Sequence, residues 1–149
     1  MARVTRTRTL QAPIGDVWRL VSDPYSLPRW WPRTSRVENV EGGGGRRTRW
    51  TKVLETAEGR GIRADFRCVS SAERERYVWE QELAGTPFER HLKGLRVDAR
   101  LRERDGGTEI ALTEEQSLKG MSKLGSPLMR RARGDVLEEA LDGIERALT

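Results

Sequence analysis

The sequence predicts an α+β fold. We expect a curved antiparallel seven-stranded sheet wrapped around a long C-terminal helix, with two short helices after the first strand. Three observations lead to this prediction. The middle of the chain consists of short alternating apolar and polar segments separated by tight turns. Residues 126–149 carry apolar side chains at helical spacing, and residues 10–31 contain a broken pair of short helical segments.

The first elements are a strand over residues 3–10 and a short helix that begins near Pro13. This helix has one apolar face, made by Ile14, Val17, Trp18 and Val21. Asp23-Pro24 ends it, because the residue before a proline is pushed out of the helical region. A second short element, stopped by Pro32, carries Leu27, Trp30 and Trp31.

Six further strands are predicted at residues 35–41, 46–55, 62–70, 75–83, 88–104 and 108–118. The connections contain strong turn residues, including four glycines at 42–45 and the hairpin signal Asp105-Gly106-Gly107. Consecutive strands joined by short turns pair antiparallel. The sheet is therefore expected to follow the order of a meander.

The C-terminal helix is expected to start at Ser126-Pro127 and to bury one apolar stripe. The stripe contains Met129, Ala132, Val136, Leu137, Ala140, Leu141, Ile144 and Leu148. Gly134 and Gly143 weaken a helix by up to about 1 kcal/mol each relative to alanine. We expect them to allow close approach of the helix to the sheet.

Composition limits the classes of function. A chain of 149 residues with a single cysteine, Cys68, is expected to form one domain, 1–149, without an intrachain disulfide. No signal peptide and no membrane-spanning stretch is visible, which predicts a cytoplasmic protein. The net charge of +5 comes from arginines mixed with acidic residues along the strands. This pattern favours a solvated surface over a nucleic-acid interface, and it leaves the oligomeric state open.

Period-two alternation indicates which strand residues face inward. On the four strands between residues 62 and 118, the inward positions include Phe66, Tyr77, Trp79, Gln81, Leu95, Val97 and Glu114. Continued backward along its strand, the same alternation places His91 on the inner face, unless a bulge at Gly94 turns it outward. An apolar, aromatic surface with a few polar groups suits a hydrophobic ligand in a cavity between helix and sheet. The predicted lining also includes Trp30, Trp31, Met121, Met129 and Leu137.

No catalytic constellation is evident. His91 is the only histidine, and Cys68 lies on an apolar face without a predictable base. One histidine and one cysteine cannot form an ordinary zinc site, and no calcium-loop spacing occurs. Gly42–Gly45 lacks the ending of a phosphate-binding loop. The sequence therefore assigns no catalytic residue, metal or cofactor.

Two segments are candidate gates of the cavity, residues 119–125 and residues 24–31. Met121 and Leu124 are apolar residues in an otherwise polar and glycine-rich loop. We expect them to approach Trp30 or Trp31 across the cavity mouth. The alternative is that they cap the core permanently.

Several of these motifs resemble the helix-grip, or START-like, superfamily, and within it the polyketide cyclase/dehydrase group of SRPBCC proteins. The resemblance extends over nearly the whole chain. It is carried by Ala12-Pro13, Val17-Trp18, Ser22-Asp23-Pro24, Leu27-Pro28, Trp30-Trp31, the glycine turn at 42–45 and the segment from Gly85 to Leu112. These motifs serve packing and turns, so they imply the fold and a ligand cavity more than a particular reaction.

Three functions follow. The leading prediction is binding or transport of a small hydrophobic ligand, such as a lipid, a polyketide or an aromatic compound, in the cavity. The second is a polyketide aromatase/cyclase or dehydratase, with His91, Tyr77 and Glu114 as proton-transfer groups. The third is a protein-interaction module that uses the arginine surface. Whether the protein catalyses a reaction stays open at this stage.

Overall fold

Seven strands of the described chain form one antiparallel sheet, in the order β1-β7-β6-β5-β4-β3-β2. The computed structural model describes residues 2–42, 45–56, 58–59, 61–119 and 126–149. The strands are β1 Ala2–Leu10, β2 Thr34–Glu41, β3 Arg49–Glu55, β4 Gly61–Ala72, β5 Arg76–Gln81, β6 Leu92–Arg104 and β7 Gly107–Leu118. The helical elements are α1 Ile14–Val21, η1 Pro24–Ser26, α2 Leu27–Trp30, η2 Gly45–Arg47, η3 Pro87–Arg90 and α3 Ser126–Leu148.

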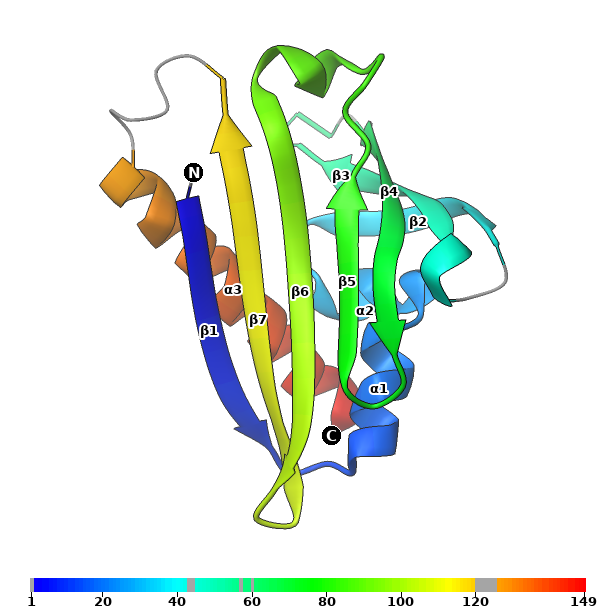
Figure 1. Cartoon of the computed structure of the whole chain (residues 1–149), viewed down its shortest axis with the longest axis vertical. Helices are drawn as coiled ribbons and strands as arrows, with labels where there is room; N and C mark the ends of the chain where they lie inside the picture. The colour runs from blue at the N-terminus through cyan, green and yellow to red at the C-terminus, as the bar shows by residue number, and fades with distance from the viewer. Residues whose placement is uncertain (1, 43–44, 57, 60, 120–125) are drawn as a thin grey trace.

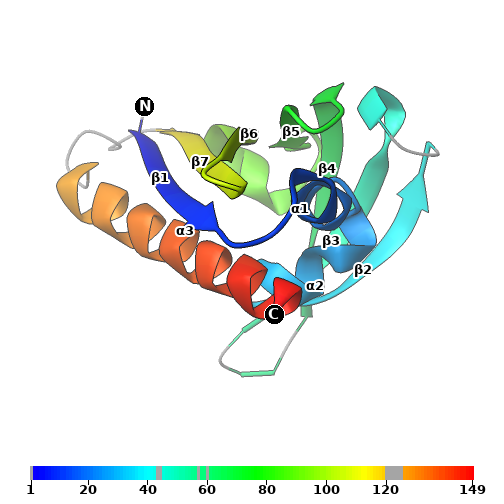
Figure 2. The ribbon, with the colours of Figure 1, turned by 90° about the horizontal axis from the view of Figure 1, so that it is seen from below.

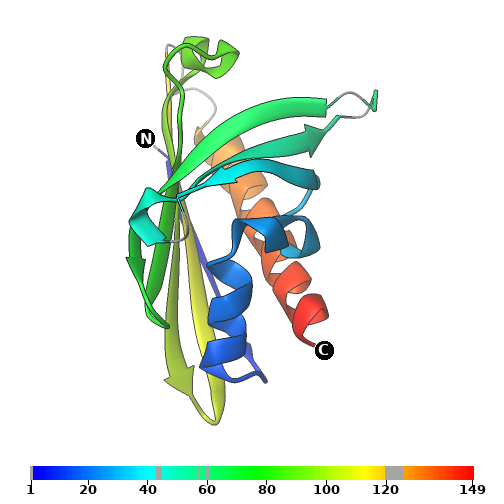
Figure 3. The ribbon, with the colours of Figure 1, turned by 90° about the vertical axis from the view of Figure 1, so that its right-hand side faces the viewer.

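The sheet curves around the long helix α3, which confirms the predicted architecture (Figures 1 and 2). All three α-helices lie on the same side of the sheet, and β2, β3 and β4 arch over them (Figure 3). α3 packs against β1 and α2, while α1 closes the lower end beside β6. The core fills the space between these layers, where α3 contributes Leu137, Ala140, Leu141 and Ile144. This arrangement places the concave face of β3–β7 opposite α3.

The strand boundaries differ from prediction where a helical turn competes with a strand. Residues 87–90 form η3 with a proline at its start, so β6 begins at Leu92 and not at residue 88. Similarly, η2 occupies residues 45–47, and β3 begins at Arg49. The predicted strand 75–83 ends at Gln81. Element types in the middle of each segment were correct, and the errors lie at the ends.

The apolar stripe of α3 is buried only in part. Leu137, Leu141 and Ile144 are fully buried, but Ala132 is exposed, so its predicted burial was wrong. The first turns of α3 project beyond the edge strand β1, where no sheet covers them (Figure 1). The side chain of Met129 lies outside the described residues, as do Met121 and Leu124 with their predicted contact to the tryptophans.

The two glycines of α3 approach different neighbours. A Cβ at Gly134 would lie 2.4 Å from a side-chain nitrogen of Arg6 on β1, so this glycine does allow approach to the sheet. A Cβ at Gly143 would lie 2.3 Å from the backbone oxygen of Trp30 and 2.7 Å from its Cα. The predicted sheet contact of Gly143 was therefore wrong, because α2 lies between this end of α3 and β2.

Gly143→Ala is expected to destabilise the protein by about 1–3 kcal/mol, because backbone atoms of α2 must move to admit the methyl group. Gly134→Ala is the matched control on the same helix. There the obstacle is the end of the long Arg6 side chain, which can move, and alanine improves helix propensity by up to about 1 kcal/mol. Urea denaturation of both variants measures the difference. Equal effects of the two substitutions would contradict the close packing of α3 on α2.

Candidate functional site

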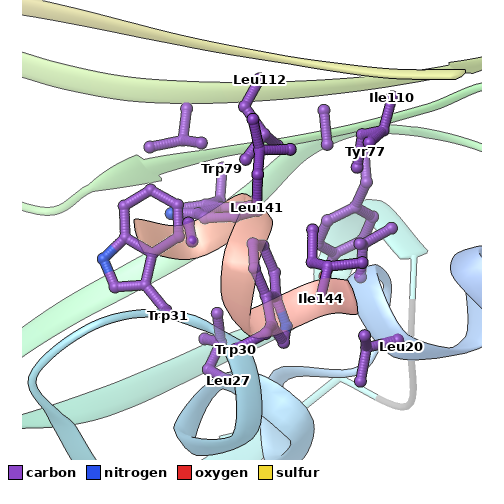
Figure 4. Packing of buried hydrophobic residues seen from close by; sticks show 14 of the residues in the cluster. Leu20, Leu27, Trp30, Trp31, Tyr77, Trp79, Ile110, Leu112, Leu141 and Ile144 are labelled. Atoms are coloured by element: carbon purple, nitrogen blue, oxygen red, sulfur yellow. The ribbon is translucent and has the colours of Figure 1, made fainter. Parts of the chain in front are cut away.

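A cluster of aromatic rings forms the centre of the molecule. Trp79 on β5 lies in the middle, with its ring centroid 6.0 Å from that of Trp30, 5.7 Å from Trp31 and 6.3 Å from Trp50. These contacts are edge-to-face, the geometry that the charge distribution of aromatic rings favours. Trp50 on β3 is buried and stacks on Phe66. Figure 4 shows Trp30, Trp31 and Trp79 gathered around Leu141 of α3.

A cavity of about 200 Å³ opens beside this cluster, between α3 and the concave face of the sheet. Aromatic and aliphatic side chains make most of its wall, and a few charged groups are set into it. The lining residues are Trp31, Pro32, Arg33, Lys52, Leu54, Ala64, Phe66, Trp79, Gln81, Phe88, Leu95, Val97, Glu114, Arg133, Val136 and Glu139. Larger hollows on the molecule lie on its outer surface and are bordered mainly by charged side chains.

The structure brings together most of the predicted lining. The predicted residues that border the cavity are Trp31, Phe66, Trp79, Gln81, Leu95, Val97 and Glu114. Trp30, Tyr77 and Leu137 are buried in the core next to the cavity and do not border it. Their inward orientation was predicted correctly, but other side chains stand between them and the open space.

His91 does not border the cavity, so its predicted place in the lining was wrong. It follows η3 and its side chain is exposed. The β6–β7 register shifts between Leu92 and Gly94, which is the bulge that the glycine suggested. This bulge reverses the inward parity, so Leu92 is buried and His91 faces solvent. Phe88 from η3 occupies the cavity wall instead.

Neither the Tyr77 hydroxyl nor the Cys68 thiol suits acid–base or nucleophilic chemistry at neutral pH. Burial raises the pKa of Tyr77, and it also raises the pKa of Cys68. Both groups therefore hold their protons more firmly than they would in water. Of the three proton-transfer groups expected for an enzyme, Glu114 lines the cavity, whereas Tyr77 and His91 do not border it.

Lys52 is the main cavity residue that sequence reasoning missed. It lies on β3 on the same face as Trp50 and Leu54, and only 5% of its surface is exposed. Its ammonium nitrogen lies 5.1 Å from the ring centre of Trp31 and 4.7 Å from that of Phe66. Burial lowers the pKa of Lys52 to about 8, with a smaller opposing effect of Glu114. The parity of Trp50 and Leu54 was a usable signal for this position.

Glu114 on β7 and Arg133 on α3 form an ion pair across the cavity, with 3.0 Å between Arg133 Nη1 and Glu114 Oε1. The Glu114 side chain is 2% exposed. Its second oxygen, Oε2, is buried without a hydrogen-bond partner among the described residues, and the same holds for Gln81 Nε2. The buried charged groups at the cavity are thus Lys52 and Glu114, whereas the Arg133 side chain is 30% exposed. Lys52 forms no ion pair among the described residues, and its nitrogen lies beside the aromatic wall.

The arginines of the outer sheet face are matched by acidic neighbours. Glu80 pairs with Arg67 and Arg96, and Glu109 pairs with Arg102 and Arg104. Arg76 donates to both carboxylate oxygens of Asp98, from Nε to Oδ1 and from Nη2 to Oδ2. Such pairs on a solvated face contribute little stability but neutralise the charge locally. They agree with the interpretation of the basic composition as a solvated surface.

Comparison with known proteins now places the chain. The family described as polyketide cyclase/dehydrase and lipid transport matches residues 1–149. The chain belongs to this family. Its description agrees with the predicted binding of a small hydrophobic molecule and also covers the predicted enzymatic alternative. No curated protein sequence matches the chain.

Solved structures share the fold of this family member. A START superfamily protein from Mycobacterium smegmatis has a TM-score of 0.76 and 14% identity, over 99% of this chain and 97% of that one. Ara h 8.0201 has a TM-score of 0.74 and 21% identity, over 98% of this chain and 96% of its own. The di-domain ARO/CYC StfQ from the steffimycin biosynthetic pathway has a TM-score of 0.78 and 13% identity. The match covers 99% of this chain but 50% of StfQ.

Two further observations concern the described residues alone. They contain no group of three or more His, Cys, Asp or Glu side chains arranged to hold a metal ion. None of their helices is both long enough and apolar enough to cross a membrane.

Proposed function

We propose that this family member binds a small hydrophobic molecule with one anionic group in the cavity between α3 and the sheet. The observation that carries the proposal is the buried Lys52 ammonium, which faces an aromatic cavity and forms no ion pair among the described residues. A charge in such a place costs free energy unless a partner compensates it. An anionic ligand supplies that partner. The cytoplasm stays the predicted location, on the basis of sequence alone.

The cavity volume limits the size of the ligand. An apolar protein cavity of about 150 Å³ holds one benzene molecule, whereas pockets for drug-sized ligands span about 300–1,000 Å³. With about 200 Å³, the cavity suits a single ring or a short branched chain. The walls of Trp31, Phe66 and Trp79 favour a flat apolar body. Benzoate combines this body with a carboxylate and is therefore the probe of choice.

Calorimetric titration with benzoate, and with the neutral benzyl alcohol for comparison, tests the proposal. Wild-type protein is expected to bind benzoate more tightly than benzyl alcohol. In Lys52→Met the affinity for benzoate should fall about 10- to 100-fold, because a hydrogen bond to a charged group contributes about 1.5–3 kcal/mol. Benzyl alcohol binding should change much less.

Lys93→Met is the matched control, because Lys93 lies on β6 with its side chain exposed. It should bind benzoate like the wild-type protein. Benzoate affinity that is the same in Lys52→Met and wild-type protein would overturn the role of Lys52. Absence of any binding of either probe would overturn the proposed use of the cavity.

A second candidate function is cyclisation or dehydration of a short polyketone. It is favoured by two groups that can exchange protons at one cavity, Lys52 with its pKa lowered to about 8 and Glu114 with a free oxygen. The cavity volume restricts this reaction to short chains. Incubation with a synthetic triketone tests it. Turnover should exceed that in buffer and disappear in both Lys52→Met and Glu114→Gln; turnover equal to that in buffer would remove this candidate.

A further inference from the structure

We propose that Lys52 is a carbonyl-reactive lysine, whose amine condenses reversibly with small hydrophobic aldehydes and ketones in the cavity. The product is an imine held between the aromatic walls. This inference rests on the proposed function of the cavity as a binding site. It adds a substrate class, carbonyl compounds, and a covalent mode of binding.

The surroundings of Lys52 leave its nitrogen free to react. The contacts of Nζ are the faces of Trp31 and Phe66, at 5.1 and 4.7 Å from the ring centres. The ion pairs among the described residues do not include Lys52, whereas Arg133 in the same cavity is paired with Glu114. An ammonium that is tied to a carboxylate keeps its proton, whereas a buried ammonium outside any ion pair loses it more easily, because burial disfavours the charged form. The cavity therefore presents a lysine nitrogen that no salt bridge among the described residues holds.

The proton equilibrium supports this chemistry. With its pKa at about 8, roughly one Lys52 amine in ten is neutral at pH 7. For a lysine at the usual value of 10.5 the neutral fraction is about 300-fold smaller. Only the neutral amine has the electron pair that attacks a carbonyl carbon. Lysines that form imines in enzymes are activated by the same kind of desolvation.

The reaction balances without an additional reactant. The nitrogen electron pair forms a bond to the carbonyl carbon, and the π electrons of the C=O bond move to oxygen. A proton passes from nitrogen to oxygen and gives a carbinolamine. The second proton then leaves the nitrogen, the C–O bond breaks, and the oxygen departs as water with that proton. Glu114 lines the same cavity, its buried Oε2 has no hydrogen-bond partner among the described residues, and we assign to it the transfer of protons in these steps.

The shape of the cavity selects the carbonyl compound. Its volume suits one ring, so benzaldehyde fits while larger aldehydes do not. Apolar walls also favour the imine over its hydrolysis, because they keep the water concentration low. Benzyl alcohol has nearly the same shape as benzaldehyde but no carbonyl group. It serves as a competitor that occupies the cavity without reacting.

Reductive trapping tests the inference. The full-length protein is incubated with benzaldehyde and sodium cyanoborohydride, which converts an imine into a stable benzylamine. Mass spectrometry of the intact chain and of its peptides then reads out the site. The chain has only four lysines, Lys52, Lys93, Lys119 and Lys123, so each can be followed separately. We expect one benzyl group on Lys52, added at least tenfold faster than on exposed Lys93 or Lys119, and slowed by benzyl alcohol.

The variants separate this inference from the proposed function. Lys52→Met should lose the fast adduct, and Lys93→Met should keep it. If benzoate binds to the wild-type protein but Lys52 is trapped no faster than Lys93, carbonyl reactivity is refuted and the binding function stands. If neither benzoate nor benzyl alcohol binds and no fast adduct forms, both the binding function and the carbonyl reactivity are refuted. Circular dichroism of Lys52→Met confirms that its loss of reaction is not loss of the fold.

Discussion

Lys52→Met should make the protein more stable by about 3 kcal/mol at pH 7. Burial lowers the pKa of Lys52 from 10.5 to about 8, and each pKa unit corresponds to about 1.4 kcal/mol against the charged form. Methionine has a similar length and packs well against the rings of Trp31 and Phe66, which now face the ammonium. The substitution therefore removes a buried charge without leaving a void.

The advantage of methionine should depend on pH in a defined window. Below pH 8 both the folded and the unfolded wild-type chains carry the Lys52 proton, so the full cost of burial is present. Between about pH 8 and 10.5 the folded protein has released this proton while the unfolded chain still binds it. The free energy of unfolding of the wild-type protein thus rises with pH relative to that of the variant. Above pH 10.5 the difference should have largely disappeared.

Urea denaturation of wild-type protein and Lys52→Met on both sides of this window measures the effect. Lys93→Met is the control, because removal of an exposed lysine should change stability by less than about 0.5 kcal/mol at either pH. A Lys52→Met protein that is less stable than wild type at pH 7 would show that the ammonium has a compensating partner. A stability difference that does not change with pH would contradict the lowered pKa.

Trp79→Ala should destabilise the protein by about 3–5 kcal/mol, the usual cost of truncating a large buried aromatic side chain. Trp79 is 1% exposed and lies against the rings of Trp30, Trp31, Trp50 and Tyr77. Its removal therefore takes away the common neighbour of four rings, which come from α2 and the residue after it, from β3 and from β5. Trp79 borders the cavity, so fewer neighbouring side chains are in position to move into the space that the missing ring leaves.

Tyr25→Ala is the control for this substitution, because Tyr25 is 64% exposed. Its effect on the unfolding midpoint in urea should be small. Trp79→Ala also enlarges the cavity, so this variant should bind a two-ring acid such as naphthoate; calorimetric titration measures that binding. A loss of less than about 1 kcal/mol in Trp79→Ala would mean that the ring cluster contributes little to the fold.

The order and type of the elements, and much of the inner surface, could be predicted from the sequence. Residues with strict period-two alternation, such as Phe66, Trp79 and Val97, were placed correctly because the side chains of a strand alternate between two faces. Glu114 followed from the same rule although it is charged. The resemblance to the helix-grip proteins agreed with this pattern, because both depend on local packing and turn residues.

The chemistry of the cavity depends on contacts that form only when the elements pack together. Lys52 is polar and follows arginine-rich residues, so its burial depends on Trp31, which directly follows α2 and covers Lys52. Arg133 and Glu114 lie 19 residues apart, on α3 and β7, and meet only because α3 crosses the concave face. The bulge before Gly94 turned His91 outward by one register step. Each outcome depends on how neighbouring elements pack together. Alternation within β3 indicated only that Lys52 shares a face with Trp50 and Leu54, and not which side chains cover it.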